Sequence, residues 1–290
     1  MNWLRFRYIY YLLSGAILLF GFIGILRGGL QPALEFTGGS ELVIDTQQSP
    51  AELETIIKGE DENNASFSIS AYQWEGQRLT LQLTQISEEQ KGVLLQAVNS
   101  KLEQPLLEVR FQTIGPAMSR ELIMKTVYAI ALGIFSILIY LWWQFKDWRF
   151  GMAGVLAMVH DSIILLGCFS WLGLLLNMKV DLLFVTALLT TLSFSVHDTI
   201  VIFDQIREQG KSGNRDIPMS IRISQAITQT LPRSLNNSFT IIFMLVTLLL
   251  LGGTSLRSFS VALLIGTITG TYSSTFVAVP LYFDMQKRKK

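Results

Sequence analysis

Long apolar stretches recur along this chain, and they predict six membrane-spanning helices. A helix that crosses the hydrocarbon core of a bilayer needs about 20 mainly apolar residues. Six stretches have this length and character. They cover residues 8–26, 122–143, 151–172, 182–203, 234–252 and 259–283. The pattern therefore predicts a polytopic α-helical membrane protein.

The segment between the first two spans has a different pattern and predicts a small α+β domain. Alternation of apolar and polar residues indicates strands, whereas helical periodicity with capping residues indicates helices. Ser87, followed by Gln90, matches a capping box at the start of the second helix. The expected elements are strands at 40–45, 67–74, 78–85 and 106–114, and helices at 50–58 and 87–103. The order βαββαβ is that of a ferredoxin-like split domain.

Composition agrees with a membrane protein and excludes some partners. Half of the residues are hydrophobic, 16% are charged, and the mean hydropathy is +0.41. The net charge of +1 gives no reason to expect nucleic-acid binding. The single cysteine cannot form an internal disulfide. The first apolar run lacks a small-residue cleavage site, so we expect a retained anchor.

The distribution of lysine and arginine predicts the orientation of the spans. Basic residues concentrate in loops on the cytoplasmic side of membranes. Here they gather before the first span, at 144–150, at 204–233 and in the tail. The two short loops on the other side contain only Lys179 and Arg257. Both termini are therefore expected in the cytoplasm.

This orientation divides the chain into four parts. Residues 1–26 form the cytoplasmic N-terminus and first span, and residues 27–121 form the exported α+β domain. Residues 122–283 hold the other five spans, with a cytoplasmic loop at 204–233. Within that loop, we expect an amphipathic helix on the membrane surface from Pro218 onward. Residues 284–290 form a basic tail.

Two aspartates lie inside apolar spans, and each follows one of the two histidines of the chain. The pairs are His160–Asp161 and His197–Asp198. An ionisable side chain at the centre of a membrane helix costs about 2.5–3.5 kcal/mol on insertion scales. Such residues often mark an ion path or a proton relay. The alternative for each is a structural role in a permanent hydrogen bond between helices.

Asp198 is the strongest candidate for an ion-coupling group. Thr191 and Ser195 share its side of the helix and make that side partly polar. Arg233 stands at the entry of the fifth span, at a depth that matches Asp198. Pairing would favour the charged carboxylate, and protonation would release the guanidinium. The alternative for Arg233 is a side chain that extends to the membrane surface.

Other small and polar residues in the spans predict helix contacts or a lined path. Asn236 and Asn237 lie one turn into the fifth span, where amides bridge helices or line a path. Gly266 and Gly270 have the four-residue spacing that permits close helix packing. We expect this packing to be against a partner subunit.

Four strings resemble the SecF family of protein-export subunits, within the RND superfamily. They are EFTGGS at 35–40, SVHDTIVIFDQIRE at 195–208, RSLNNSF at 233–239 and GTITGTYSS at 266–274. The order of elements is also similar to that of half an RND transporter. It consists of one span, an exported βαββαβ domain and five further spans. The resemblance covers nearly the whole chain. The chain departs from the family pattern at Glu35, His197 and Gln205, where Asp, Asn and Arg are usual.

The resemblance implies a function in protein export. Members of this family work with a SecD-like subunit in the bilayer of the bacterial inner membrane or of an internal energy-transducing membrane. They assist the SecYEG channel and use an ion gradient to help complete preprotein export. The resemblance assigns the key acid to Asp198 and the key arginine to Arg233. It also marks Phe36, Thr37, Gly38 and Gly39 as a family motif, and it implies no cofactor or metal.

Alternatives remain at this stage. One is an RND-type half-transporter that exports a small molecule or lipid, and another is a passive scaffold for other subunits. An enzyme is not expected, because the sequence has no Cys/His cluster at metal spacing and no Gly-x-Ser-x-Gly motif. Neither aspartate has the flanking glycine typical of intramembrane aspartyl proteases. Protons are favoured over sodium because of His197 and because the sequence shows no recognisable dense cage of hydroxyls and carbonyls.

Overall fold

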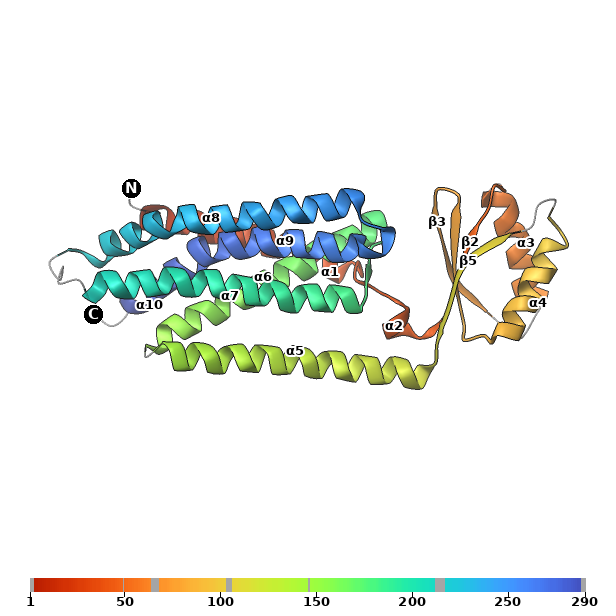
Figure 1. Cartoon of the computed structure of the whole chain (residues 1–290), viewed down its shortest axis with the longest axis horizontal. Helices are drawn as coiled ribbons and strands as arrows, with labels where there is room; N and C mark the ends of the chain where they lie inside the picture. Colours follow the sequence, from red (N-terminus) through yellow and green to blue (C-terminus); the bar gives the residue numbers. More distant parts are fainter. Residues whose placement is uncertain are drawn as a thin grey trace. The chain divides into compact units, whose positions relative to one another are not determined.

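The computed structural model describes residues 3–48, 50–63, 68–102, 106–145, 147–211 and 217–287. The chain forms two compact units (Figure 1). One is helical and comprises Met1–Gln31 and Tyr128–Lys290. The other is an α+β unit, Pro32–Val127.

The α+β unit contains a four-stranded sheet with two helices packed against it. Its elements are α2 (Leu34–Thr37), β2 (Gly39–Asp45), α3 (Pro50–Asn63), β3 (Ile69–Glu75), β4 (Arg78–Leu83), α4 (Glu88–Asn99) and β5 (Leu107–Ile114). The strand order is β3-β4-β2-β5, and every neighbouring pair is antiparallel. The predicted order of strands and helices is confirmed, because alternation and capping were strong local signals.

The core of this unit follows from strand alternation. Leu42 and Ile44 of β2, and Leu79 and Leu81 of β4, are at most 1% exposed. Because they alternate along their strands, they lie on one face of the sheet. There they pack in one cluster with residues of α3 and α4, which include Leu53, Ile57, Leu94 and Val98. The helices therefore cover one face of the sheet.

The capping box predicted for α4 is confirmed. Ser87 Oγ accepts a hydrogen bond from the Gln90 backbone N–H at 3.3 Å. The Gln90 side chain accepts one from the Ser87 backbone N–H at 2.8 Å. These two bonds satisfy two of the four N–H groups that a helix start leaves without helical partners.

The helical unit holds the membrane-spanning segments. Its elements are a 3-10 turn (Trp3–Phe6), α1 (Arg7–Leu26), α5 (Pro116–Gln144, which begins in the α+β unit), α6 (Trp148–Leu176), α7 (Leu182–Lys211), α8 (Met219–Leu251), a second 3-10 turn (Thr254–Leu256), α9 (Arg257–Ser273), a π-helical turn (Ser274–Ala278) and α10 (Val279–Lys287). Two short strands, β1 (Gln31–Pro32) and β6 (Lys179–Val180), lie in connections. Among the described residues, six helices are long and apolar enough to cross a membrane, as predicted.

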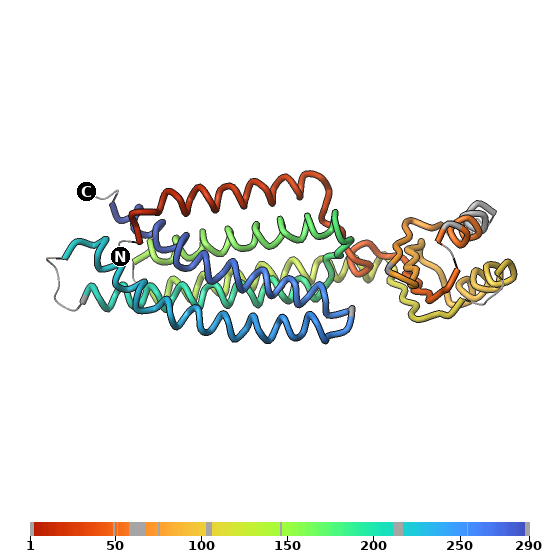
Figure 2. Tube along the Cα trace, turned by 90° about the horizontal axis from the view of Figure 1, so that it is seen from above, coloured from red at the N-terminus to blue at the C-terminus, as the bar shows by residue number. Residues whose placement is uncertain are grey.

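Helices α6, α7 and α9 form the centre of the helical unit. In the most apolar stretch of each of these helices, about half of the residues are buried inside the protein. In the most apolar stretch of α5, no residue is buried. Figures 1 and 2 show these helices running alongside one another, and α9 packs against α6, α7 and α8. Polar side chains on these helices therefore meet in the interior.

The first 3-10 turn, Trp3–Phe6, and α10 lie at the same end of the helical unit, where α7 also ends and α8 begins (Figures 1 and 2). Arg7 of α1 forms an ion pair with Asp284 of α10, with 3.2 Å between Nε and Oδ1. Tyr11 Oη donates to the same carboxylate at 3.0 Å. This arrangement agrees with an even number of spans.

The polar segment 204–233 is more helical than the sequence indicated. It was expected to be a loop with a helix on the membrane surface, but α7 continues to Lys211 and α8 starts at Met219. α8 then runs through Pro232 without a break. Ile223 and Ile227 are at most 1% exposed and pack in one cluster with Ile202 of α7. Burial of this apolar stripe inside the protein explains why it does not lie on the membrane surface.

Substitution Ser87→Ala should destabilise α4. It removes the side-chain acceptor of the capping box, a loss that typically costs about 1 kcal/mol. Hydrogen exchange of the α4 amides in the full-length protein should speed up roughly fivefold. Ser100→Ala is the matched control, since Ser100 Oγ donates to Ala97 O at the other end of the helix. Unchanged exchange in the Ser87 variant would show that the cap does not stabilise the helix.

Candidate functional site

Asp198 of α7 joins three helices in the interior of the helical unit. Its side chain is only 6% exposed. Oδ2 accepts hydrogen bonds from Ser234 Oγ of α8 at 2.6 Å and from Ser274 Oγ of the π-helical turn at 2.7 Å. A buried carboxylate is costly unless hydrogen bonds compensate it. The two hydroxyl groups provide this compensation, so the charge state of Asp198 affects contacts between α7, α8 and the segment after α9.

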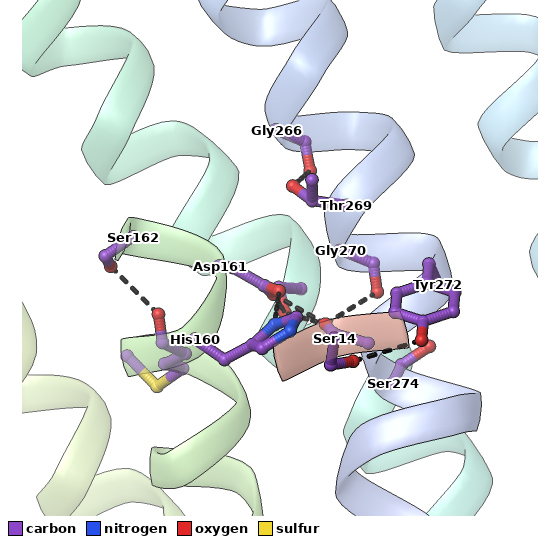
Figure 3. Close-up of polar contacts among 12 residues, drawn as sticks. Ser14, His160, Asp161, Ser162, Gly266, Thr269, Gly270, Tyr272 and Ser274 are labelled. Atoms are coloured by element: carbon purple, nitrogen blue, oxygen red, sulfur yellow. Dashed lines mark hydrogen bonds and ion pairs between the residues drawn. The ribbon is translucent and has the colours of Figure 1, made fainter. Parts of the chain in front are cut away.

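Asp161 of α6 forms a second, similar centre. It is also 6% exposed, and Oδ2 accepts from Ser195 Oγ of α7 at 2.5 Å and from Ser273 Oγ of α9 at 2.6 Å. His160 Nδ1 lies 3.0 Å from Oδ1 of the same carboxylate. Figure 3 shows the imidazole turned toward Asp161, with Gly270 and Tyr272 beyond it. Asp161 thus links α6, α7 and α9.

Three of these hydroxyl donors were not identified from the sequence. They are Ser234, Ser273 and Ser274. Sequence reasoning also placed Ser195 beside Asp198, whereas it donates to Asp161. The available signal was the presence of hydroxyl residues inside apolar spans. The Ser273-Ser274 pair in particular ends one of the family-like strings.

Arg233 of α8 precedes Ser234, a donor to Asp198, and lines a cavity. Asp198 is held by hydroxyls in this structure, and Arg233 is exposed. The cavity has a volume of about 220 Å³ and lies between α7 and α8. Its lining residues are Val201, Asp204, Gln205, Glu208, Gln229, Thr230 and Arg233. Residues 201, 205 and 208 follow Asp198 at helical spacing, so the cavity lies on the Asp198 side of α7.

His197 points away from this centre. It is exposed, whereas its neighbour Asp198 is buried. Adjacent side chains on a helix point about 100° apart, which explains the difference. The structure therefore brings His160, but not His197, to a buried acid.

Thr191, Gly266 and Gly270 hold α7 and α9 close together. Thr191 Oγ1 donates to Leu188 O of its own helix at 2.9 Å. A Cβ atom on Gly266 would overlap the Thr191 side chain, and one on Gly270 would lie 3.1 Å from Ser195 Cβ. The glycines were expected to pack on a partner subunit, but they pack on α7 of the same chain. This close approach lets the short serine side chains reach the acids.

Two exposed polar stripes run along the membrane helices. On α8, Arg233, Asn236, Asn237 and Thr240 are exposed at helical spacing. On α7, the exposed residues Thr186, Thr190, Ser193 and His197 also share one side. Polar groups inside a membrane usually face other helices or a water-filled cavity rather than lipid.

The family-like motif Phe36–Gly39 belongs to the α+β unit and forms a corner. Gly38 and Gly39 have φ angles of +69° and +110°, a tight turn that was predicted from the pair. A Cβ atom on Gly39 would lie 2.6 Å from Leu83 O. Ser119 Oγ donates to Phe36 O at 2.9 Å. The described contacts of this motif are therefore structural.

The surroundings of the two acids bear on ligand chemistry. Among the described residues, no group of three or more His, Cys, Asp or Glu side chains is arranged to hold a metal. Hydroxyls nevertheless surround the two acids, and Ser238 Oγ lies 2.6 Å from Thr271 Oγ1 nearby. The sequence-based preference for protons rested on His197 and on the lack of a recognisable dense cage of hydroxyls and carbonyls, and it stays a prediction. Each acid is thus held by two hydroxyl donors from other helical segments.

Comparisons with known proteins agree on one family. Residues 94–288 match the family described as "Protein export membrane protein SecD/SecF, C-terminal". The protein translocase subunit SecF of Thermobaculum terrenum is 37% identical over 98% of this chain and 93% of its own length. The SecF subunit of Haemophilus influenzae is 32% identical over 100% of this chain and 87% of its own.

A solved structure supports the same conclusion. The crystal structure of SecDF from Thermus thermophilus, a translocon-associated membrane protein, has a TM-score of 0.82 and 30% identity. The alignment covers 98% of this chain and 38% of the SecDF chain. Together with the six apolar helices, this shows a multi-pass membrane protein.

Substitution Gly266→Ala should destabilise the helical unit. The added methyl group overlaps Thr191, and overpacking of this kind typically costs about 1–3 kcal/mol. A lower unfolding temperature in lipid or detergent is the expected result. Gly151→Ala in α6 is the control, because a Cβ there meets no atom within 4 Å. Alanine also favours helix over glycine by about 1 kcal/mol. Equal unfolding temperatures for both variants would contradict close packing at Gly266.

Proposed function

Because this chain belongs to the SecD/SecF family of protein-export membrane proteins, we propose that it is a SecF-type subunit that couples an ion gradient to preprotein export. The observation that carries the coupling role is the position of Asp198. It is a buried carboxylate that two hydroxyls tie to α8 and to the segment after α9. Its charge state can therefore alter contacts among several helices.

The proposed coupling step is binding and release of a cation at Asp198. A proton on Oδ2 would need an acceptor, so Ser234 or Ser274 would have to turn its hydroxyl hydrogen elsewhere. A sodium ion would likewise take the oxygen lone pairs that now accept these bonds. Moving one charge across 100 mV is worth about 2.3 kcal/mol. That energy shifts a conformational equilibrium more than tenfold.

Arg233 and the cavity give this site a route to one end of the helical unit. The cavity lies between α7 and α8, where their polar ends meet, and is lined by acidic, amide and hydroxyl groups. We assign it as the cytoplasmic approach to Asp198. In a second conformation, Arg233 would move from the cavity to pair with the charged carboxylate. Asp161, His160 and His197 are proposed as further ion-coupling groups.

The polar stripes on α7 and α8 support a membrane partner. Exposed Asn236, Asn237 and His197 would be costly against lipid. A second half of similar architecture would cover them, as transporters with two related halves place their ion sites at the interface. The SecDF protein of Thermus thermophilus supports a SecD-like partner, because this chain matches only 36% of that single protein. The SecYEG channel and the translocating preprotein are proposed as further partners.

The α+β unit is proposed to be a ferredoxin-like domain on the exported side of the bacterial inner membrane. Its βαββαβ order and its strand order β3-β4-β2-β5 support this assignment. The concentration of basic residues at the chain ends supports a cytoplasmic position for both termini. In this orientation the unit would meet preprotein as it leaves the channel.

Substitution Asp198→Asn should abolish gradient-dependent export while leaving the protein assembled. Asparagine keeps the size of the side chain and one oxygen that can accept from the serine hydroxyls, but it cannot bind a proton or hold a charge. Export into membrane vesicles, measured with and without an imposed ion gradient, should lose its gradient-dependent part. Normal stimulation by the gradient would disprove the coupling role.

The matched control for this experiment is Asp181→Asn. Asp181 Oδ1 accepts from the Phe184 backbone N–H at 2.7 Å at the start of α7. Asparagine caps helices about as well as aspartate. This variant should retain gradient-dependent export, which would separate the specific loss at Asp198 from a general effect of removing a carboxylate.

Substitution of both Asn236 and Asn237 by leucine should weaken association with the SecD-like partner. Hydrogen bonds between membrane helices contribute about 0.6–2 kcal/mol each, so copurified partner should fall several-fold. Thr247→Val is the control on the same helix, since Thr247 Oγ1 already donates to Phe243 O at 2.9 Å. Undiminished copurification of the double variant would place the partner elsewhere.

A further inference from the structure

We propose that Asp161 is a second proton-binding carboxylate, and that Ser273 and Ser274 make its protonation and that of Asp198 interdependent. The inference builds on the proposed ion-coupling role of Asp198. It adds a physical link between two acids that lie on different helices, α6 and α7.

The link follows from two consecutive residues. Ser273 Oγ donates to Asp161 Oδ2 at 2.6 Å, and Ser274 Oγ donates to Asp198 Oδ2 at 2.7 Å. Neighbouring side chains on a helix diverge by about 100°, so one short segment can reach an acid on each of two helices. The helix changes from α to π geometry at this point, with α9 ending at Ser273 and the π-helical turn starting at Ser274.

Each serine has a second acceptor within its own helix. Ser273 Oγ lies 3.3 Å from Gly270 O, and Ser274 Oγ lies 3.1 Å from Thr271 O. A hydroxyl group has only one hydrogen to donate. Each serine therefore has two hydrogen-bonded states, one directed to a carboxylate and one directed to a backbone carbonyl.

Proton binding selects between these states. A proton from the gradient that joins Asp161 Oδ2 turns that oxygen into a donor, and Ser195 or Ser273 must then accept it. When Ser273 accepts, its own hydrogen turns to Gly270 O, and on proton release it returns to the carboxylate. Ser273 and Ser274 are joined by a peptide bond. A movement of Ser273 that accompanies the change of its hydrogen bond therefore alters the position of Ser274 relative to Asp198.

Other titratable groups contribute to the charge balance of the two sites. His160 Nδ1 lies 3.0 Å from Asp161 Oδ1, so the imidazole contacts the carboxylate directly. Its Nε2 is buried and makes no hydrogen bond to the described residues. Tyr272 of α9 packs near the imidazole, with ring centroids 6.4 Å apart. Figure 3 shows Tyr272 bonded to Ser14 of α1 rather than to Asp161. Further titratable groups on the neighbouring elements include Tyr10 and Tyr11 of α1, Cys168 of α6, His197 of α7, Arg233 of α8, and Tyr282 and Asp284 of α10.

Infrared titration of the complex with its SecD-like partner in lipid vesicles tests the link directly. Labelled aspartate would identify the protonated carboxyl bands, and loss of a band in Asp198→Asn or Asp161→Asn would assign each. Removal of the Asp161 charge should lower the protonation midpoint of Asp198 by about one pH unit or more, the size at which two titrations count as coupled. Asp198→Asn should shift the Asp161 midpoint by the same amount, because coupling between two sites is reciprocal.

The serines are tested in the same measurement. In a Ser273→Ala, Ser274→Ala background, the shift caused by Asp161→Asn should fall to less than half. Ser260→Ala is the matched control, because Ser260 is a buried serine of α9 that donates to Leu256 O and should leave the shift intact. If Asp161→Asn does not assemble, the reciprocal shift in Asp198→Asn provides the same comparison.

The outcomes separate this inference from the proposed function. Independent midpoints, or no protonation of Asp161 over the pH range in which the complex stays assembled, would overturn the second site. A full shift in the serine variant would overturn the role of the serine pair. If the second site or the role of the serine pair is overturned but Asp198→Asn still loses gradient-dependent export, the proposed function remains intact. Normal export in that variant would reject the proposed function, whatever the infrared titration shows.

Discussion

A carboxylate inside a membrane must be compensated by hydrogen bonds or by a bound cation, and this constraint organises the centre of the helical unit. Asp161 and Asp198 each accept two hydroxyl hydrogen bonds from other helices. The acids therefore act as junctions between α6, α7, α8 and α9. Any change in their charge must rearrange donors on neighbouring helices, and this is how a small cation can affect a large structure.

Short hydroxyl side chains reach the acids only because the helices approach closely. Gly266 and Gly270 of α9 lack the side chains that would hold α7 at a greater distance. Closely packed interiors rearrange between discrete arrangements rather than deforming continuously. Glycine packing and acid–hydroxyl bonding are thus two parts of one structural device. A site built in this way suits an alternation between two helix arrangements.

Polar groups are distributed in two distinct ways in the helical unit. The buried acids and their donors satisfy one another within the chain. The stripes that contain Asn237 of α8 and His197 of α7 are instead exposed. In a bilayer, exposed polar side chains require another protein surface or water. The chain therefore resembles one half of an assembly, in agreement with the two-part SecDF protein to which it is similar.

The sequence by itself determined the six spans, the βαββαβ order and the acids worth attention. Span length, strand alternation, helix capping and the cost of a buried charge are local properties. Residues such as Ser87, Gly38 and Asp198 can therefore be recognised from the sequence without knowledge of the tertiary structure. Tertiary structure alone decided which partners meet. Ser195 donates a hydrogen bond to Asp161, whereas Ser234 and Ser274 donate to Asp198. Gly266 packs on α7 of its own chain. It also decided that α8 continues through Pro232, since the apolar stripe before that residue is buried against α7. Helical periodicity places a side chain on a face of its own helix, but the distance between helices determines which groups bond across that face.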